Sequence, residues 1–178
     1  MKKVTILVAL GSVLFSMLGY TVYKSWQPKP KAKIQEVVVA NDEQTSVQVV
    51  EMIEDRKIPV QKEIPMDIQE ERMQRFIHAM SHQKVESEKK WGFLPLTPER
   101  VNRLLEVAKT NKDKYEYGER YVEILTRWAK KDFEAIQYDH NEIWKLQDGN
   151  VGEATGVLTN EEEKEYIGQH FDLEIKEN

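Results

Sequence analysis

The chain has 178 residues, a formal net charge of −5 at pH 7 and no cysteine. The missing cysteine excludes disulfides, thiolate metal sites and thiol chemistry. Residues 1–60 carry eight Lys or Arg and six Asp or Glu, whereas residues 61–178 carry 18 and 25. Because an acidic domain repels phosphate backbones, nucleic acid is excluded as a partner.

Residues 4–23 form an uncharged, mostly apolar segment with lysines on both sides. At about 1.5 Å rise per residue, such a helix spans about 30 Å, the thickness of the hydrocarbon core of a bilayer. The segment is longer than the apolar region of a cleaved signal peptide and lacks its small-residue cleavage pattern. We therefore predict a transmembrane anchor (signal-anchor) over residues 1–24, with the lipid bilayer as the partner of residues 4–23.

The lysines around this segment give two opposite indications of its orientation. Two lysines precede it and four follow it within residues 24–33. Since lysines favour the cytoplasmic side, the count places the following domain inside the cell. The short basic flank ahead of the segment, however, is typical of a signal-anchor whose domain is exported. We take a single-pass protein of the cell membrane, with an extracytoplasmic domain, as the expectation.

The remainder divides into a stalk and a helical domain. Residues 25–64 are predicted to form a flexible stalk, because prolines interrupt a lysine-rich stretch that polar residues follow. Over residues 65–171 apolar side chains recur at helical spacing, and no segment after residue 60 shows convincing strand alternation. The pattern predicts an all-α domain of about four to five helices, followed by an acidic tail at residues 172–178.

Capping residues mark the expected helix starts. Thr97 and Pro98 supply a cap and a proline at the first helical position. Thr159 and Glu162 have the spacing of a capping box for the last helix. Aspartates are expected to open the other helices, and these are Asp67, Asp113 and Asp132.

His78 and His82 lie one helical turn apart, a spacing at which two imidazoles can hold a metal ion such as zinc. Both point away from the apolar stripe of their helix, so we expect them on a polar, solvated face. The chain lacks the glutamate that follows the first histidine in zinc proteases. A third ligand would come from His140, Asp139, His170 or a distant carboxylate. We predict no cofactor, with zinc at this pair as the alternative.

His140 lies on the apolar face of its helix, between Ile136 and Ile143. This position is typical of a core histidine whose ring nitrogens are hydrogen-bonded. Burial would tune its proton affinity near neutral pH, which would suit a domain that senses pH or a ligand.

The loop around Trp91 and Phe93 is apolar. It either plugs the core between helices or walls a groove for a peptide or glycan. With His140 and Trp144, these aromatics are the candidate binding residues. No carboxylate stands isolated in an apolar setting and no serine lies in a nucleophile elbow, so the sequence supports no enzymatic activity.

Five segments within residues 64–171 form a distinctive set. They are Ile77–Val85, Lys90–Phe93, Thr97–Arg100, Asp139–Leu146 and Gly152–Gly156. In this order the set resembles an uncharacterised family, a domain of unknown function, of short membrane-anchored proteins from Bacillus-like Gram-positive bacteria. The resemblance implies a plasma-membrane location and one domain of unknown function, and it implies no activity, cofactor or catalytic residue.

The sequence thus favours a membrane-tethered helical interaction or binding module, presented to another protein or a cell-wall polymer. A metal-binding protein or metal-dependent enzyme that uses His78 and His82 is one alternative. A regulatory domain that senses pH or a ligand through His140 is the other.

Overall fold

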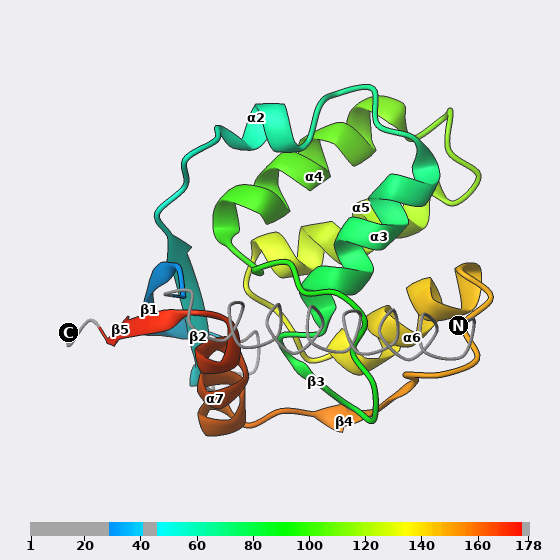
Figure 1. The fold of residues 1–178 in the computed structure, drawn as a ribbon. Coiled ribbons are helices and arrows are strands. Elements are labelled where there is room, and N and C mark those ends of the chain that lie inside the picture. Colours follow the sequence, from blue (N-terminus) through cyan, green and yellow to red (C-terminus); the bar gives the residue numbers. More distant parts are fainter. Residues whose placement is uncertain (1–28, 41–45, 176–178) are drawn as a thin grey trace, which may run out of the picture. The chain divides into compact units, whose positions relative to one another are not determined.

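The computed structural model describes residues 29–40 and 46–175. The chain divides into two units, Met1–Pro30 and Lys31–Asn178, and the described residues of the second contain six helices and five strands (Figure 1). The helices are α2 (Val60–Glu63), α3 (Glu70–Ser81), α4 (Pro98–Asn111), α5 (Gly118–Ala129), α6 (Ile136–Leu146) and α7 (Asn160–His170). The strands are β1 (Lys31–Ala40), β2 (Ser46–Glu54), β3 (Val85–Ser87), β4 (Ala154–Val157) and β5 (Asp172–Ile175).

The prediction of an all-α domain is wrong, because the chain forms two sheets and has a mixed α/β fold. β1 pairs antiparallel with β2 from Ala32↔Glu54 to Ala40↔Ser46, and β5 pairs with β1 in parallel. β3 and β4 form a second, antiparallel sheet. Figure 1 shows α7 beside the three-stranded sheet, with α3 to α6 grouped away from both.

The two long strands lie in residues 25–64, the segment that we expected to be a flexible stalk. Ala32 and Ile34 are buried, whereas Lys31 and Lys33, which alternate with them, point outward. Both lysines form ion pairs with Glu174 on β5. This alternation has the period of two that a half-buried strand requires. The alternation is short and follows two prolines, so in the sequence alone these lysines resemble those of a solvated spacer.

The prediction of a single-pass membrane protein must also be corrected. Within residues 29–40 and 46–175, no helix is long and apolar enough to cross a membrane. The segment that we predicted to span the bilayer, residues 4–23, lies outside the described residues.

The predicted helix N-caps are correct only at the two threonines. The Thr97 side chain accepts a hydrogen bond from the backbone of α4, and Pro98 is its first residue. The Thr159 capping box is present in full at the start of α7. The expected aspartate caps were wrong: α3, α5 and α6 follow Gln69, Tyr117 and Ala135, none of which caps through its side chain.

Two apolar clusters hold the domain together. The larger lies among α3 to α6 and includes Met73, Ile77, Leu104 and Trp128, each at most 2% exposed. The smaller lies between the three-stranded sheet and α7, and its members are Ala32, Ile34, Val50, Met52, Ile167 and Phe171. Since burial of apolar surface contributes about 25 cal/mol per Å², these two clusters supply most of the drive for folding.

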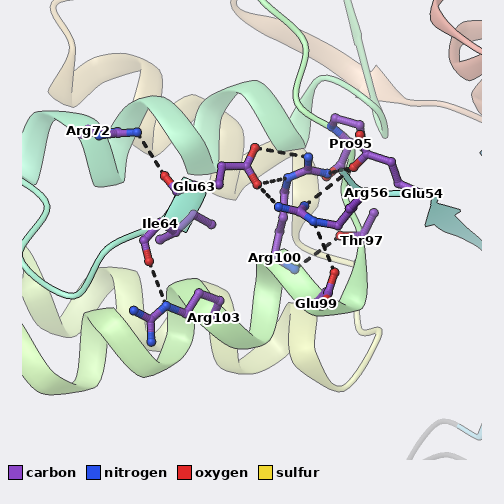
Figure 2. A network of polar contacts seen from close by, with 10 residues as sticks. All are labelled: Glu54, Arg56, Glu63, Ile64, Arg72, Pro95, Thr97, Glu99, Arg100 and Arg103. Atoms are coloured by element: carbon purple, nitrogen blue, oxygen red, sulfur yellow. Dashed lines mark hydrogen bonds and ion pairs between the residues drawn. The ribbon is translucent and has the colours of Figure 1, made fainter. Parts of the chain in front are cut away.

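Ion pairs join the end of β2 and the short helix α2 to α4 (Figure 2). Arg100 Nη1 lies 2.6 Å from Glu54 Oε2, and Arg100 Nε lies 3.0 Å from Glu63 Oε2. Arg56 also pairs with Glu63 and lies 3.4 Å from Glu99. Burial would raise the pKa of Glu63, but hydrogen bonds from the two arginines outweigh it and the pKa is lowered. The network therefore holds a charged, low-pKa carboxylate between the hairpin and the helices.

A second polar link is buried almost completely. Lys84 Nζ lies 2.8 Å and 2.7 Å from the two carboxylate oxygens of Glu163 on α7. Gln83 Nε2 donates to the same carboxylate at 2.8 Å, and Gln83 Oε1 accepts from Leu96 N at 3.0 Å. Lys84 Nζ also lies 3.4 Å from the carbonyl oxygen of Val50 on β2. This group connects β2, β3, α7 and the loop that follows β3.

We expect Glu163→Gln to lower the free energy of unfolding by about 3 kcal/mol or more, because it leaves the buried Lys84 ammonium without a counter-charge. Glu123→Gln, which breaks an exposed pair with Arg120, is the matched control and should change it by less than about 0.5 kcal/mol. Urea denaturation of both variants measures the difference. Equal stabilities would contradict the structural role of the buried pair.

Candidate metal centre

Two helices bring three histidines together. His78 lies in the last turn of α3 and His82 is the C-cap residue one turn further on, with their ring centroids 4.7 Å apart. His140 on α6 lies 4.6 Å from His78 and 5.3 Å from His82, measured between ring centroids. One ligand atom from each residue lies within 4.8 Å of the other two. A single ion among them can therefore contact all three rings with small side-chain adjustments, since zinc–nitrogen bonds are about 2.0–2.1 Å long.

Hydrogen bonds orient the two rings on α3. His78 Nδ1 lies 2.5 Å from Gln147 Oε1, and His82 Nδ1 lies 2.8 Å from the carbonyl oxygen of Gly92. Both partners are acceptors, so Nδ1 carries the proton and donates in each neutral ring. The Nε2 lone pair is then available to a metal. A ligating histidine in metal sites commonly has its other nitrogen bound in this way.

The ring of His140 has two possible proton arrangements, and only one of them leaves a lone pair on Nε2. Ser81 Oγ lies 2.7 Å from the carbonyl oxygen of His78 and 2.8 Å from His140 Nδ1. If Ser81 donates to the carbonyl, His140 Nδ1 donates to Ser81, and His140 Nε2 keeps a lone pair. If Ser81 donates to the ring instead, His140 Nε2 donates to the carbonyl oxygen of Gly152, 3.1 Å away. Coordination of a metal ion by His140 Nε2 would require the first arrangement.

All three rings are neutral at pH 7. Burial lowers the pKa of His78, and burial, reinforced by the repulsion that a proton on one ring exerts on the next and by Lys90, lowers that of His82 to about 3 and that of His140 to about 4. The desolvated rings resist protonation because an imidazolium loses its hydration shell there. Neutral imidazole is the form that binds metal ions, so the cluster is already in its ligand state.

The sequence left several candidates for the third metal ligand, and the structure places one of them beside His78 and His82. His140 joins the pair, whereas the Asp139 carboxylate binds Arg127 and accepts from Trp128 Nε1 at 2.9 Å. His170 stacks on a phenylalanine outside the cluster. His140 is buried with both ring nitrogens hydrogen-bonded, as predicted.

The predicted solvated face of α3 was wrong. His82 is only 2% exposed, because α6 and the loop after β3 cover the side of α3 opposite its apolar stripe. Periodicity along α3 shows its apolar stripe, but it gives no sign that a second, polar side is also covered.

The remaining candidate binding residues lie apart from the cluster or around its edge. Trp91 is 70% exposed. Phe93 packs on α7, with its ring 5.4 Å from that of Tyr166. Trp144 is partly buried and donates from Nε1 to the carbonyl oxygen of Val151 at 2.9 Å, which fixes the loop after α6. The apolar loop of Trp91 thus contributes to the core through some side chains and leaves one large aromatic exposed.

The fold and this cluster define a small mixed α/β domain with a three-histidine centre. Residues 77–168 match a family of unknown function, DUF6241, and the chain belongs to this family. The match confirms the expected uncharacterised domain and contains all three histidines. No curated protein and no solved structure matches the chain significantly.

The low histidine pKa values predict a pH-dependent stability of the metal-free chain. Between about pH 6.5 and the folded-state pKa values of about 3 and about 4, the unfolded chain binds more protons than the folded chain. The free energy of unfolding should therefore fall as pH decreases below about 6.5, by up to about 1.4 kcal/mol per pH unit for each histidine that stays neutral. Above about pH 7 this contribution is complete and constant.

Urea denaturation with a chelator present, at several values between about pH 5 and 6.5, measures this slope, and comparison with a histidine variant cancels the contribution of carboxylates whose pKa is raised by burial, such as Asp139. A variant with both His82→Gln and His140→Gln should have a flatter profile than the parent. Identical slopes would show that the rings do not remain neutral in the folded chain.

Proposed function

We propose that the chain binds a divalent transition-metal ion, zinc being the first candidate, through His78, His82 and His140. The observation that carries the proposal is the mutual reach of one ligand atom from each ring, within 4.8 Å. Imidazole suits zinc, copper, nickel and iron, whereas magnesium and calcium prefer oxygen ligands. The cluster contains no thiolate or carboxylate, which favours the first group of metals.

The surroundings of the three rings support the same function. Gln147, Gly92 and Ser81 each lie within hydrogen-bond distance of one Nδ1 atom. This outer shell sets the ring orientations before a metal arrives, so less conformational entropy is lost on binding.

The number of ligands bears on what the metal would do. Structural zinc sites are closed by four protein ligands, whereas sites with three protein ligands keep a position for water or substrate. His78 is the least buried of the three and marks the side from which solvent would reach the ion. The arrangement supports a metal with one exchangeable position, on which either transport or hydrolytic chemistry can be built.

Two other hypotheses remain predictions. The exposed ring of Trp91 is compatible with an interaction module, but no described contact identifies its partner. Sensing of pH through His140 is less favoured by the structure, because a pKa of about 4 places its titration below the range near neutrality. The metal proposal alone rests on three side chains from two helices that meet at one point.

We expect the full-length chain to bind one Zn²⁺ ion, and His78→Gln, His82→Gln and His140→Gln each to weaken binding by about 100-fold or more. This exceeds the roughly 10–100-fold loss that removal of an outer-shell partner causes, which is the result expected for Gln147→Ala. Isothermal titration calorimetry measures all four. Zinc at about 100 times its Kd should also raise the free energy of unfolding by about 2.7 kcal/mol.

The chain provides its own control in its fourth histidine. His170 is the one histidine outside the cluster, so His170→Gln should bind zinc as the parent does. Absence of binding at micromolar zinc, or an equal loss in His170→Gln, would overturn the proposal. The visible spectrum of the Co²⁺ form would report whether the coordination is tetrahedral.

A further inference from the structure

A pocket lies between the loop after β3 and helix α7. Its volume is about 450 Å³, and its lining includes Glu88, Lys90, Gly92, Phe93, Tyr166 and His170. This volume lies within the range of small-molecule sites. Gly92 lines this pocket and also contacts the histidine cluster, because its carbonyl oxygen binds His82.

One wall of the pocket is aromatic. The rings of Phe93 and His170 stack with centroids 4.2 Å apart and an interplanar angle of 11°. Tyr166 meets both edge-on, at 5.4 Å from Phe93 and 5.2 Å from His170. These contacts fix the rings against one another, so the wall is rigid and presents apolar edges to a ligand.

The pocket also contains a cation without an acceptor. Lys90 Nζ lies 4.0 Å from the centroid of the Tyr166 ring and forms no hydrogen bond or ion pair with any residue that the structure describes. Lys90 is partly buried, and burial lowers its pKa to about 8. Glu86 and Glu163 attract the ammonium electrostatically, but neither accepts a hydrogen bond from it, so its three N–H donors are left to a ligand.

We propose that this pocket binds a small monocarboxylate with an aromatic or apolar body. The carboxylate accepts charge-assisted hydrogen bonds from Lys90, and the body packs on the wall of Phe93 and Tyr166. Glu88 lines the same pocket and Glu86 and Glu163 act on Lys90, so a dianion such as phosphate meets about twice the repulsion that a single carboxylate meets. The inference does not depend on metal binding, since none of the three clustered histidines lines the pocket.

The test compares benzoate with benzamide, which has the same shape but no charge, on the full-length chain with a chelator present. NMR titration should show that benzoate binds about tenfold more tightly or better, with shifts at Gly92 and Tyr166, because the amide oxygen can accept from Lys90 but carries no negative charge to pair with the ammonium. This comparison uses the unmodified protein, so it holds even if a variant fails to fold. Equal binding of the two compounds, or no binding of benzoate at millimolar concentration, would overturn the proposal.

Two lysine variants localise the effect. Lys90→Met should abolish the preference for benzoate, whereas Lys89→Met, which removes an exposed neighbouring ammonium, should leave it unchanged. An equal loss in both variants would mean that general charge rather than the pocket binds the anion. Because all measurements are made without metal, a negative result here leaves the zinc titration unaffected, and the reverse also holds.

Discussion

The buried pair of Lys84 and Glu163 is the constraint on which the rest of the domain depends. Their side chains are 6% and 3% exposed, and the desolvation of two such charges is offset only when good geometry and further hydrogen bonds accompany the pair. Gln83 and the carbonyl oxygen of Val50 provide them. The pair therefore holds only if β2, β3 and α7 occupy their observed places together, and the hairpin, the helical core and α7 become parts of one domain.

Both candidate sites contact the loop that this pair helps to hold in place. Gln83 accepts from Leu96 N at the far end of the loop, and between them Gly92 directs its carbonyl oxygen to His82. Gly92 has φ of +85°, a conformation that costs a residue with a side chain more than it costs glycine. The next residue, Phe93, packs on α7 and lines the pocket. A metal at the histidines and an anion at Lys90 would thus both act on the short segment around Gly92.

The sequence predicts those features of this domain that depend on neighbouring residues. The starts of α4 and α7 were predicted correctly because a threonine and the residues within one turn of it determine a cap. Strand β5 was missed because four residues at the end of the chain pair with β1, which is more than a hundred residues away. The burial of His140 was predicted from its own helix, but that of His82 was not, since helix α6 and the loop of Gly92 cover it.

Burial of the three histidine rings lowers their pKa values, and the same burial favours the neutral form that a metal ion would bind. A proton satisfies one ring, and the positive charge it adds, far from solvent, disfavours a second proton on a ring 4.6–5.3 Å away. A metal ion satisfies three rings with one charge centre, and its bonds to nitrogen replace the lost hydration. Three apolar side chains would fill this part of the core as well as the histidines do, and they would need no hydrogen-bond partners. Three neutral imidazoles, each with a partner at Nδ1, therefore support the proposed transition-metal site.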